Sequence, residues 1–112
     1  MIFQESDDFS KDFKRLKKKY LSIDKDFEIF SEVLETFPKG NGSRHCNILT
    51  DKNPHFILKS RMRCKTLLST ELRVIYCFNE ELQSITFIEI YYKGDKENED
   101  EARIKSFINA II

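Results

Sequence analysis

Alternating apolar and polar positions over residues 56–96 predict three consecutive β-strands. The predicted strands run from Phe56 to Met62, from Leu72 to Phe78 and from Ile85 to Tyr92. Each is rich in β-branched and aromatic residues, which pack well on a pleated surface. Residues 79–81 separate the last two strands by a link short enough for a hairpin. We therefore expect a sheet on which the rest of the chain packs.

Side-chain alternation gives this predicted sheet two different faces, because successive residues of a strand point to opposite sides. One face is apolar and the other carries a row of cations. The apolar positions are Phe56, Leu58, Met62, Leu72, Val74, Tyr76 and Phe78, and the cationic positions are Lys59, Arg61, Arg63 and Arg73.

Two amphipathic helices are predicted before the sheet. The first follows Ser6, a residue that can cap it, and its apolar residues recur at helical spacing. The second follows Ser22, a second candidate cap, and must end near Phe37 because Pro38 comes next. The apolar stripes are Phe9, Phe13, Leu16 and Tyr20 in the first helix and Ile23, Phe27, Phe30, Val33, Leu34 and Phe37 in the second. We expect an αα-hairpin on the apolar face.

The ends of the chain and its middle add further elements. A last helix is predicted after the acidic residues 97–101, which suit a helix N-terminus, and its apolar stripe covers the sheet or meets a partner. Residues 2–4 suit a short edge strand, and residues 45–50 form a short strand or an irregular crossing. The stripe of the last helix is Ile104, Phe107, Ile108 and Ile111. The expected fold of residues 1–112 is a single α+β domain. Two N-terminal helices pack on a three- to four-stranded, mostly antiparallel sheet, followed by a C-terminal helix.

Composition supports a folded domain with localised charge. Hydrophobic residues make up 40% of the chain and ten residues are Phe, so a core can form. Lysine plus arginine equals aspartate plus glutamate at 19 each, which argues against a strongly basic nucleic-acid binder. The charges are segregated, however. Residues 56–73 carry five basic and one acidic side chain, and residues 95–101 carry five acidic and one basic. A phosphate backbone can therefore still be held locally.

The cysteines and histidines give no strong metal or disulfide signal. Cys46, Cys64 and Cys77 are odd in number and widely spaced, which is typical of reduced thiols in a cytoplasmic protein. A metal site from Cys46 with His45 or His55 is a minor alternative, and no cofactor is expected. The two histidines are also acid–base candidates, although a histidine in an exposed loop is more often idle. We expect no membrane segment, because no apolar run is long enough.

Three segments carry a family resemblance. They are RVIY at residues 73–76, IYYKGDKE at residues 90–97 and DFSKDFKRLKKKYLSIDKDFEIF at residues 8–30. In this order they resemble the third strand, the last strand and the opening helices of the RelE/ParE superfamily, toxins of type II toxin–antitoxin pairs. The RelE-like mRNA interferase branch fits best. The link at residues 64–71 departs from the family, since it lacks the glycines that many relatives have there.

The resemblance implies an endoribonuclease that cuts mRNA on the ribosome without a metal and is bound by a cognate antitoxin. The antitoxin is expected to cover the cationic face or to displace the last helix. From the residues alone, the Arg73 guanidinium suits a phosphate clamp, and Glu89 or Tyr91 suits proton transfer, tuned by burial against Lys93. The expected catalytic residues are Arg73, Tyr91, Lys93 and Glu89, and the expected RNA-binding residues are Lys59, Arg61, Arg63, Lys65 and Lys96.

Two other functions remain open on the same fold. One is a ParE-like toxin that inhibits DNA gyrase by binding and cuts no RNA. The other is a non-catalytic member that binds its antitoxin, which the missing loop glycines and the zero net charge favour. Alternating cations are also often just the solvent face of an antiparallel sheet. Loss of toxicity on Arg73→Ala with the fold intact separates a ribonuclease from a gyrase inhibitor.

Overall fold

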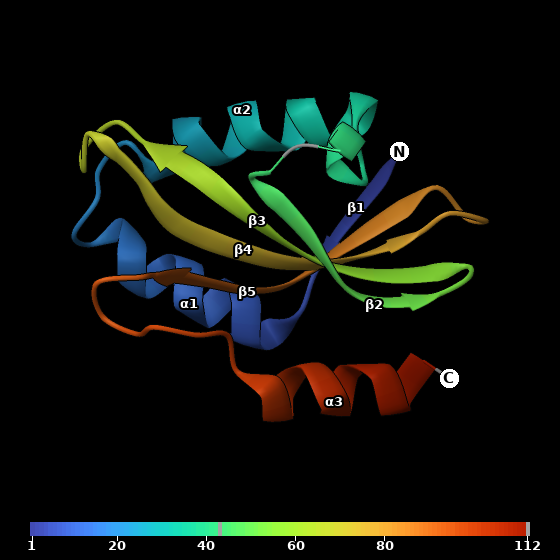
Figure 1. Cartoon of the computed structure of the whole chain (residues 1–112). Helices are drawn as coiled ribbons and strands as arrows, with labels where there is room; N and C mark the ends of the chain where they lie inside the picture. Colours follow the sequence, from blue (N-terminus) through green and yellow to red (C-terminus); the bar gives the residue numbers. More distant parts are fainter. Residues whose placement is uncertain (43, 112) are drawn as a thin grey trace.

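A five-stranded sheet with helices on both faces makes up the molecule (Figure 1). The computed structural model describes residues 1–42 and 44–111. Its elements are β1 (Ile2–Glu5), α1 (Asp7–Lys17), α2 (Ile23–Thr36), the 3₁₀ turn η1 (Gly40–Gly42), β2 (Cys46–Lys52), β3 (His55–Cys64), β4 (Ser69–Asn79), β5 (Ser84–Tyr92) and α3 (Glu101–Ile111). Helices α1 and α2 pack on one face, here called the first face, and α3 packs on the second face.

The strands lie in the order β1-β5-β4-β3-β2. Strand β1 runs parallel to β5, and the other neighbours are antiparallel. The predicted α+β fold and its mostly antiparallel sheet are therefore confirmed. The sheet has one strand more than the expected range, because both weakly predicted segments form strands: residues 2–5 pair with β5, and Cys46–Lys52 pair with β3.

The two N-terminal helices begin where the sequence predicts, but only one of the two serines caps its helix. The Ser6 hydroxyl accepts a hydrogen bond from the Phe9 N–H at 3.1 Å, as a capping residue does. The Ser22 hydroxyl instead donates to Asp26 Oδ2 at 2.6 Å and accepts from the Thr66 N–H at 3.0 Å. Ser22 therefore fastens α2 to the β3–β4 turn, and the prediction that it caps the helix is wrong.

The first face carries a continuous aromatic core. Phe9 of α1 is fully buried, and its ring lies 5.3 Å from that of Phe87. The Phe27 ring of α2 lies 4.8 Å from the same Phe87 ring. Tyr76 is buried beneath α2, and its hydroxyl donates to the Pro38 carbonyl at 2.9 Å. Each such side chain removes a large apolar area from water, worth roughly 1.5–3 kcal/mol. The predicted apolar face is therefore confirmed.

The second face differs from the sequence prediction of a purely cationic surface. Part of it is apolar and lies under α3. The sheet residues of this apolar part are Ile57, Ile75, Cys77, Ile88 and Tyr91, and the helix residues are Ile104, Phe107, Ile108 and Ile111. The prediction was wrong because it rested on the charged positions of β3. It did not include the apolar residues of β4 and β5 whose side chains point to the same face. The expectation that the last helix covers the sheet is confirmed.

A buried ion pair ties α3 to α1 around the edge of β5. Strand β1 pairs with β5 only as far as Phe87, so the β5 edge beyond that point has no strand neighbour. Asp12 of α1, 4% exposed, accepts there from the Ile90 N–H at 3.4 Å and from Arg103 Nη1 at 2.6 Å. Arg103 Nη1 also donates to the Ile88 carbonyl at 3.1 Å. Burial, the largest single cause, would lower the pKa of Arg103, but the hydrogen bond to Asp12 and the negative charges of Asp12, Glu89 and Asp8 together raise it.

The remaining general predictions concern thiols and membranes. Cys46, Cys64 and Cys77 are all free, and the latter two are buried. Burial raises the pKa of the Cys77 thiol to about 11, so this group is an unreactive core residue at neutral pH. Within the residues described, no helix is long and apolar enough to cross a membrane.

Candidate functional site

Two cross-strand rows of polar side chains lie on the second face, beside the N-terminal end of α3. Arg61 lies opposite Arg73, and Arg73 lies opposite Tyr91. In the adjacent row, Ile75 separates Lys59 from Glu89. These positions share a face because strand side chains alternate and the three strands are consecutive neighbours. We call Lys59, Arg61, Arg73, Glu89, Tyr91 and Lys96 the sheet-end cluster.

Arg73 is the most firmly held cation of the sheet-end cluster. The residue is 7% exposed, and its Nη1 donates to the Thr70 carbonyl at 2.6 Å and to the Leu72 carbonyl at 3.3 Å. Burial, together with the nearby charge of Arg61, lowers its pKa. An arginine nevertheless stays charged at neutral pH. The guanidinium is therefore a fixed positive charge whose position is set by the backbone.

Tyr91 faces Arg73 and has an unsatisfied hydroxyl. The residue is 6% exposed, and its hydroxyl makes no hydrogen bond of standard geometry with any described residue. Burial, together with the carboxylates of Glu99 and Glu89, raises the pKa of Tyr91 in spite of the nearby Lys59 ammonium. The phenol is therefore protonated at neutral pH and is able to donate a proton.

Lys59 is paired with an acidic residue from outside the sheet. Its Nζ lies 2.7 Å from Glu99 Oε1, and the two side chains are 21% and 13% exposed. Burial, the largest single cause, would lower the pKa of Lys59, but the hydrogen bond to Glu99 together with the charge of Glu99 and the contact with Tyr91 raises it. Burial would likewise raise the pKa of Glu99, but the hydrogen bond to Lys59 lowers it. Both groups are charged at neutral pH.

Glu89 anchors the start of α3. It is 1% exposed, its Oε2 pairs with Lys96, and its Oε1 accepts from the Asp100 N–H at 2.8 Å. The sequence predicted Lys93 as the neighbouring cation, but the ion pair is with Lys96, whose Nζ also lies 5.2 Å from the centre of the Tyr91 ring. Because both carboxylate oxygens are engaged, Glu89 positions the helix start and is poorly placed to accept a proton.

The predicted residues that lie outside the sheet-end cluster are few. Lys93 is exposed in the turn after β5, and only its backbone N–H is engaged, with the Glu71 carbonyl at 2.9 Å. Arg63 and Lys65 line a separate groove. His55 pairs with Asn79, six residues along the strands from the Arg61–Arg73 pair, or roughly 20 Å away. His55 therefore does not belong to the cluster.

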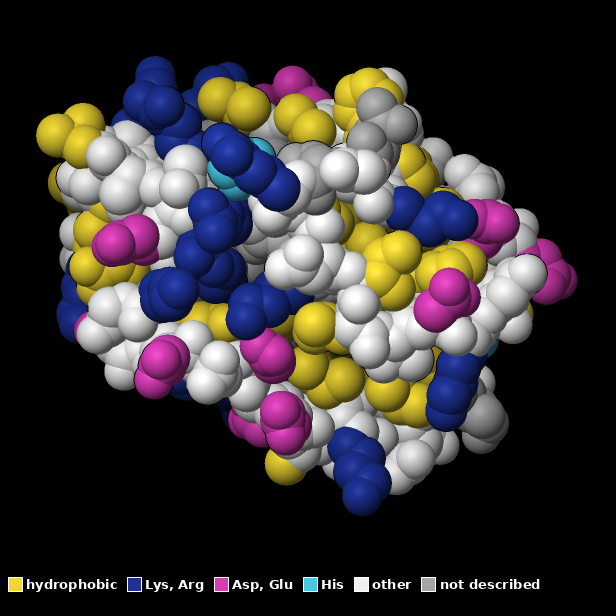
Figure 2. All heavy atoms as spheres, in the orientation of Figure 1, with side chains coloured by type: hydrophobic (Ala, Val, Ile, Leu, Met, Phe, Trp, Pro, Cys, Tyr) yellow, Lys and Arg dark blue, Asp and Glu magenta, His cyan; other side chains and the backbone are white. Residues whose placement is uncertain are grey.

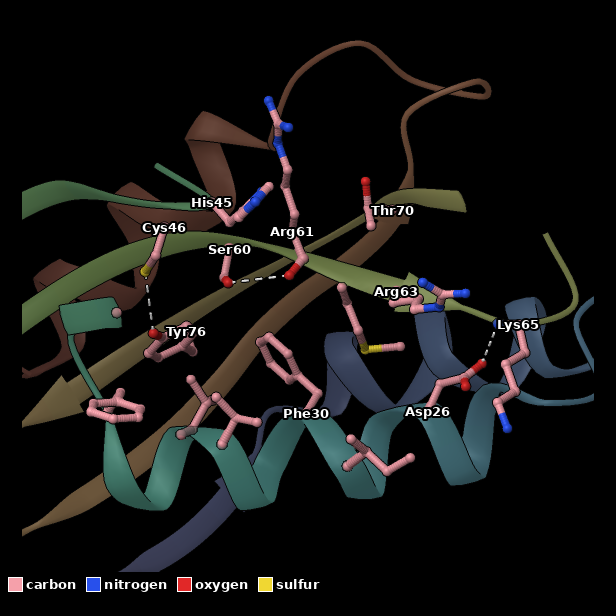
Figure 3. A pocket seen from close by; sticks show the side chains of 16 residues that line it. Asp26, Phe30, His45, Cys46, Ser60, Arg61, Arg63, Lys65, Thr70 and Tyr76 are labelled. Atoms are coloured by element: carbon pink, nitrogen blue, oxygen red, sulfur yellow. Dashed lines mark hydrogen bonds between the residues drawn. The ribbon is translucent and has the colours of Figure 1, made fainter. Parts of the chain in front are cut away.

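The separate groove, here called the α2–β3 groove, has a volume of about 570 Å³ (Figure 3). Strand β2 ends at Cys46, opposite Ser60, so the rest of β3 has α2 beside it instead of a strand. Phe30, Leu34 and Met62 are among the apolar side chains that line the groove. Figure 3 shows Arg63 and Lys65 beside Asp26 at one end, while the Arg61 side chain points away from α2.

His45 is a residue that the sequence did not assign to the site. Its carbonyl accepts the Arg61 N–H at 2.9 Å, and Figure 3 shows the two side chains next to each other at the rim of the groove. The loop before β2 has no periodicity that would reveal this placement. The only available signal was that His45 and His55 are the two histidines of the chain.

Basic side chains gather in one band on this side of the molecule (Figure 2). Acidic side chains lie along part of its border. The band explains how a chain with no net charge presents a local surface that attracts anions.

Comparisons with known proteins give one informative result. No protein-family model and no curated protein sequence matches the chain. A solved structure does: a chain in the crystal structure of the archaeal RelE–RelB complex from Pyrococcus horikoshii OT3. The two share 20% sequence identity with a TM-score of 0.60, over 83% of this chain and 94% of that one. At this identity the likeness concerns the fold, and the protein therefore has a RelE-like α+β fold.

Proposed function

We propose that the chain is the toxin of a toxin–antitoxin pair and a metal-independent endoribonuclease that cuts mRNA on the ribosome. The observation that carries the proposal is the Arg73–Tyr91 pair on a RelE-like fold. The positively charged Arg73 guanidinium lies directly opposite Tyr91 on the neighbouring strand, and the buried Tyr91 phenol stays protonated. A row of cations that only faces solvent requires neither a guanidinium held by the backbone nor a buried phenol beside it.

The sheet-end cluster supplies two of the three tasks that RNA cleavage requires. Arg73 and Arg61 stabilise the charge that develops on the phosphorane, and a guanidinium held by backbone carbonyls need not reorganise to do so. Tyr91 protonates the leaving 5′-oxygen, because its raised pKa keeps the proton available at neutral pH.

For the third task, removal of the 2′-hydroxyl proton, we propose His45. Its carbonyl is bonded to the Arg61 N–H, which places the residue at this end of the sheet. Histidine is also the side chain best suited to proton transfer near neutral pH. Glu89, the other candidate, would first have to release Lys96 or the Asp100 N–H.

For the antitoxin we propose a binding site in the α2–β3 groove, occupied by an extended acidic segment. Beyond Arg61, whose N–H is bonded to the His45 carbonyl, the β3 edge has no strand neighbour among the described residues, so an added strand can pair with it. The apolar groove accepts alternate side chains, and Arg63 and Lys65 attract carboxylates. The solved RelE–RelB structure is itself a complex with a second protein, which is consistent with such a partner.

Cleavage of mRNA in a translating extract tests the proposed activity. The wild type is expected to cut inside translated codons, and Arg73→Ala to cut at least about a hundredfold more slowly. Lys25→Ala, a cation removed from the exposed surface of α2, serves as the matched control and is expected to cut normally. Circular dichroism checks that all three proteins are equally folded. Absence of cuts from folded wild type would contradict the ribonuclease.

A further inference from the structure

We propose that Lys59 and Tyr91 form a phosphate-binding subsite and that the Glu99 carboxylate of the same chain fills it in the free protein. The inference rests on the proposed ribonuclease function and adds its regulation: RNA must displace Glu99 before a phosphate can reach Lys59. Glu99 belongs to the acidic link of residues 95–100, which joins β5 to α3.

The Glu99 carboxylate lies where a bound anion would lie. Its Oε1 is 2.7 Å from Lys59 Nζ, and both side chains are largely shielded from solvent. The link is fixed on each side of Glu99, since Lys96 pairs with Glu89 and the Asp100 N–H donates to the same carboxylate. This attachment keeps Glu99 close to Lys59, so its effective concentration at the subsite is high.

The unsatisfied Tyr91 hydroxyl is the second observation that points to a ligand. Glu99 satisfies Lys59, whose ammonium also donates toward the Tyr91 oxygen, but the hydroxyl proton of Tyr91, in a residue 6% exposed, has no acceptor of standard geometry among the described residues. A buried donor without an acceptor is costly and uncommon. A phosphate group has more acceptor oxygens than one carboxylate oxygen and could accept from both Lys59 and Tyr91. The subsite is therefore incompletely satisfied by its internal occupant.

An internal anion reduces the affinity for an external one. The apparent dissociation constant for RNA is the intrinsic constant divided by the fraction of molecules in which Glu99 has left the subsite, so it rises as that fraction falls. The free toxin would then hold loose RNA weakly. A ribosome that presents mRNA in a fixed position would compete with Glu99 more effectively, because less freedom is lost on binding.

Replacing the carboxylate by an amide tests the inference. The probe is a fluorescein-labelled single-stranded 2′-O-methyl RNA of about ten nucleotides, which cannot be cleaved at the 2′-hydroxyl, measured by fluorescence anisotropy. Glu99→Gln is expected to bind about threefold to tenfold more tightly than the wild type. The logarithm of its affinity is expected to fall more steeply with the logarithm of salt concentration, by about 0.7, because one more cation meets a phosphate.

Glu97→Gln is the matched control, because it makes the same change of charge in the same link. Glu97 is exposed and has no hydrogen bond or ion pair among the described residues. The affinity of Glu97→Gln for the RNA probe is expected to differ less than twofold from that of the wild type. In a Lys59→Gln background, Glu99→Gln should have no further effect. If Glu99→Gln does not fold, Glu99→Asp is measured in its place, because aspartate keeps the charge but has a shorter side chain.

Equal affinities for Glu99→Gln and Glu97→Gln would overturn the subsite. The proposed enzyme stands or falls separately, on mRNA cleavage in the translating extract. Tighter RNA binding by Glu99→Gln without any cleavage by the wild type would keep the subsite and reject the ribonuclease. Cleavage by the wild type with unchanged RNA binding by Glu99→Gln would keep the ribonuclease and reject the subsite.

Discussion

The two faces of the sheet solve different problems. The first face is closed by two helices over a continuous aromatic core, and its buried residues are nearly all apolar. The second face is closed by α3, and beside the start of that helix it holds Arg73, Glu89 and Tyr91 in buried positions. Buried charges cost stability unless each is compensated. The first face therefore supports folding, whereas the second carries the site that we propose for RNA.

The largest effect on stability is expected from the first face. Phe9→Ala removes a fully buried ring that contacts Phe27 and Phe87, and should lower the free energy of unfolding by about 3–5 kcal/mol. Chemical denaturation measures the change. Leu21→Ala is the control, because Leu21 is 83% exposed and its loss should cost about 0.5 kcal/mol or less. Similar losses for both variants would contradict the description of this core.

A smaller and local effect is expected where α3 is attached. Arg103→Ala leaves the buried Asp12 with Arg15, at 3.0 Å, and the Ile90 N–H as partners and should cost about 1–3 kcal/mol. Hydrogen exchange should show faster exchange in α3 than in α1 or β4, because α3 is the element released. Uniformly faster exchange throughout the protein would show that the two faces unfold together and would remove the contrast between them.

Tyr91→Phe should separate activity from stability. Removing the proposed general acid is expected to slow mRNA cleavage by about 10²- to 10⁴-fold. The free energy of unfolding should stay the same or rise slightly, since the lost hydroxyl has no hydrogen bond of standard geometry among the described residues. A variant that is destabilised and still active would assign Tyr91 to structure alone.

The smallest effect concerns the pH dependence of the Lys59–Glu99 pair. The pKa of Glu99 is lowered on folding, so its stabilisation is present above the unfolded value and is lost as pH falls through the folded one. The pKa of Lys59 is raised, so its stabilisation is present below the unfolded value and is lost as pH rises through the folded one. The pair should therefore contribute about 1 kcal/mol or less between roughly pH 5 and pH 10.

Urea unfolding of the wild type and of the Lys59→Gln/Glu99→Gln double variant measures this contribution. The difference in stability between the two proteins should be constant from pH 6 to pH 9 and should be smaller at pH 3, because below the ordinary pKa of a glutamate the stabilisation that comes from the lowered pKa of Glu99 is being lost. A difference that stays the same at pH 3 would show that the ion pair contributes nothing to it.

Strand positions were predictable from the sequence because of their period of two. Arg73 was placed on the cationic face, and the register puts Tyr91 opposite it. The resemblance to RelE-type toxins gave the fold from ordered motifs, and the solved RelE–RelB structure agrees with it. Their catalytic roles remain predictions, since no measurement yet tests them.

The rest of the candidate site depends on contacts that have no signature in the sequence. Glu99 and Lys96 reach the cluster from a link without periodicity, and long-range ion pairs of this kind cannot be deduced from spacing. The extra residue in β5 at the Ile75–Tyr76 register shift and the shift after Met62 also alter where neighbouring side chains lie. Strand alternation alone therefore assigned Arg63 to the cluster, whereas it lines the α2–β3 groove.

Single-turnover cleavage of an mRNA held on stalled ribosomes tests the central claim most directly. Wild type, Arg73→Lys and Lys25→Ala would be compared, with the cut positions mapped by primer extension. The account predicts one cut within the codon held in the A site, unchanged by Lys25→Ala. It also predicts a loss of about a hundredfold in Arg73→Lys, which keeps the charge but lacks the fork of donors. Equal rates for Arg73→Lys and the wild type, or no cut from folded wild type, would contradict it.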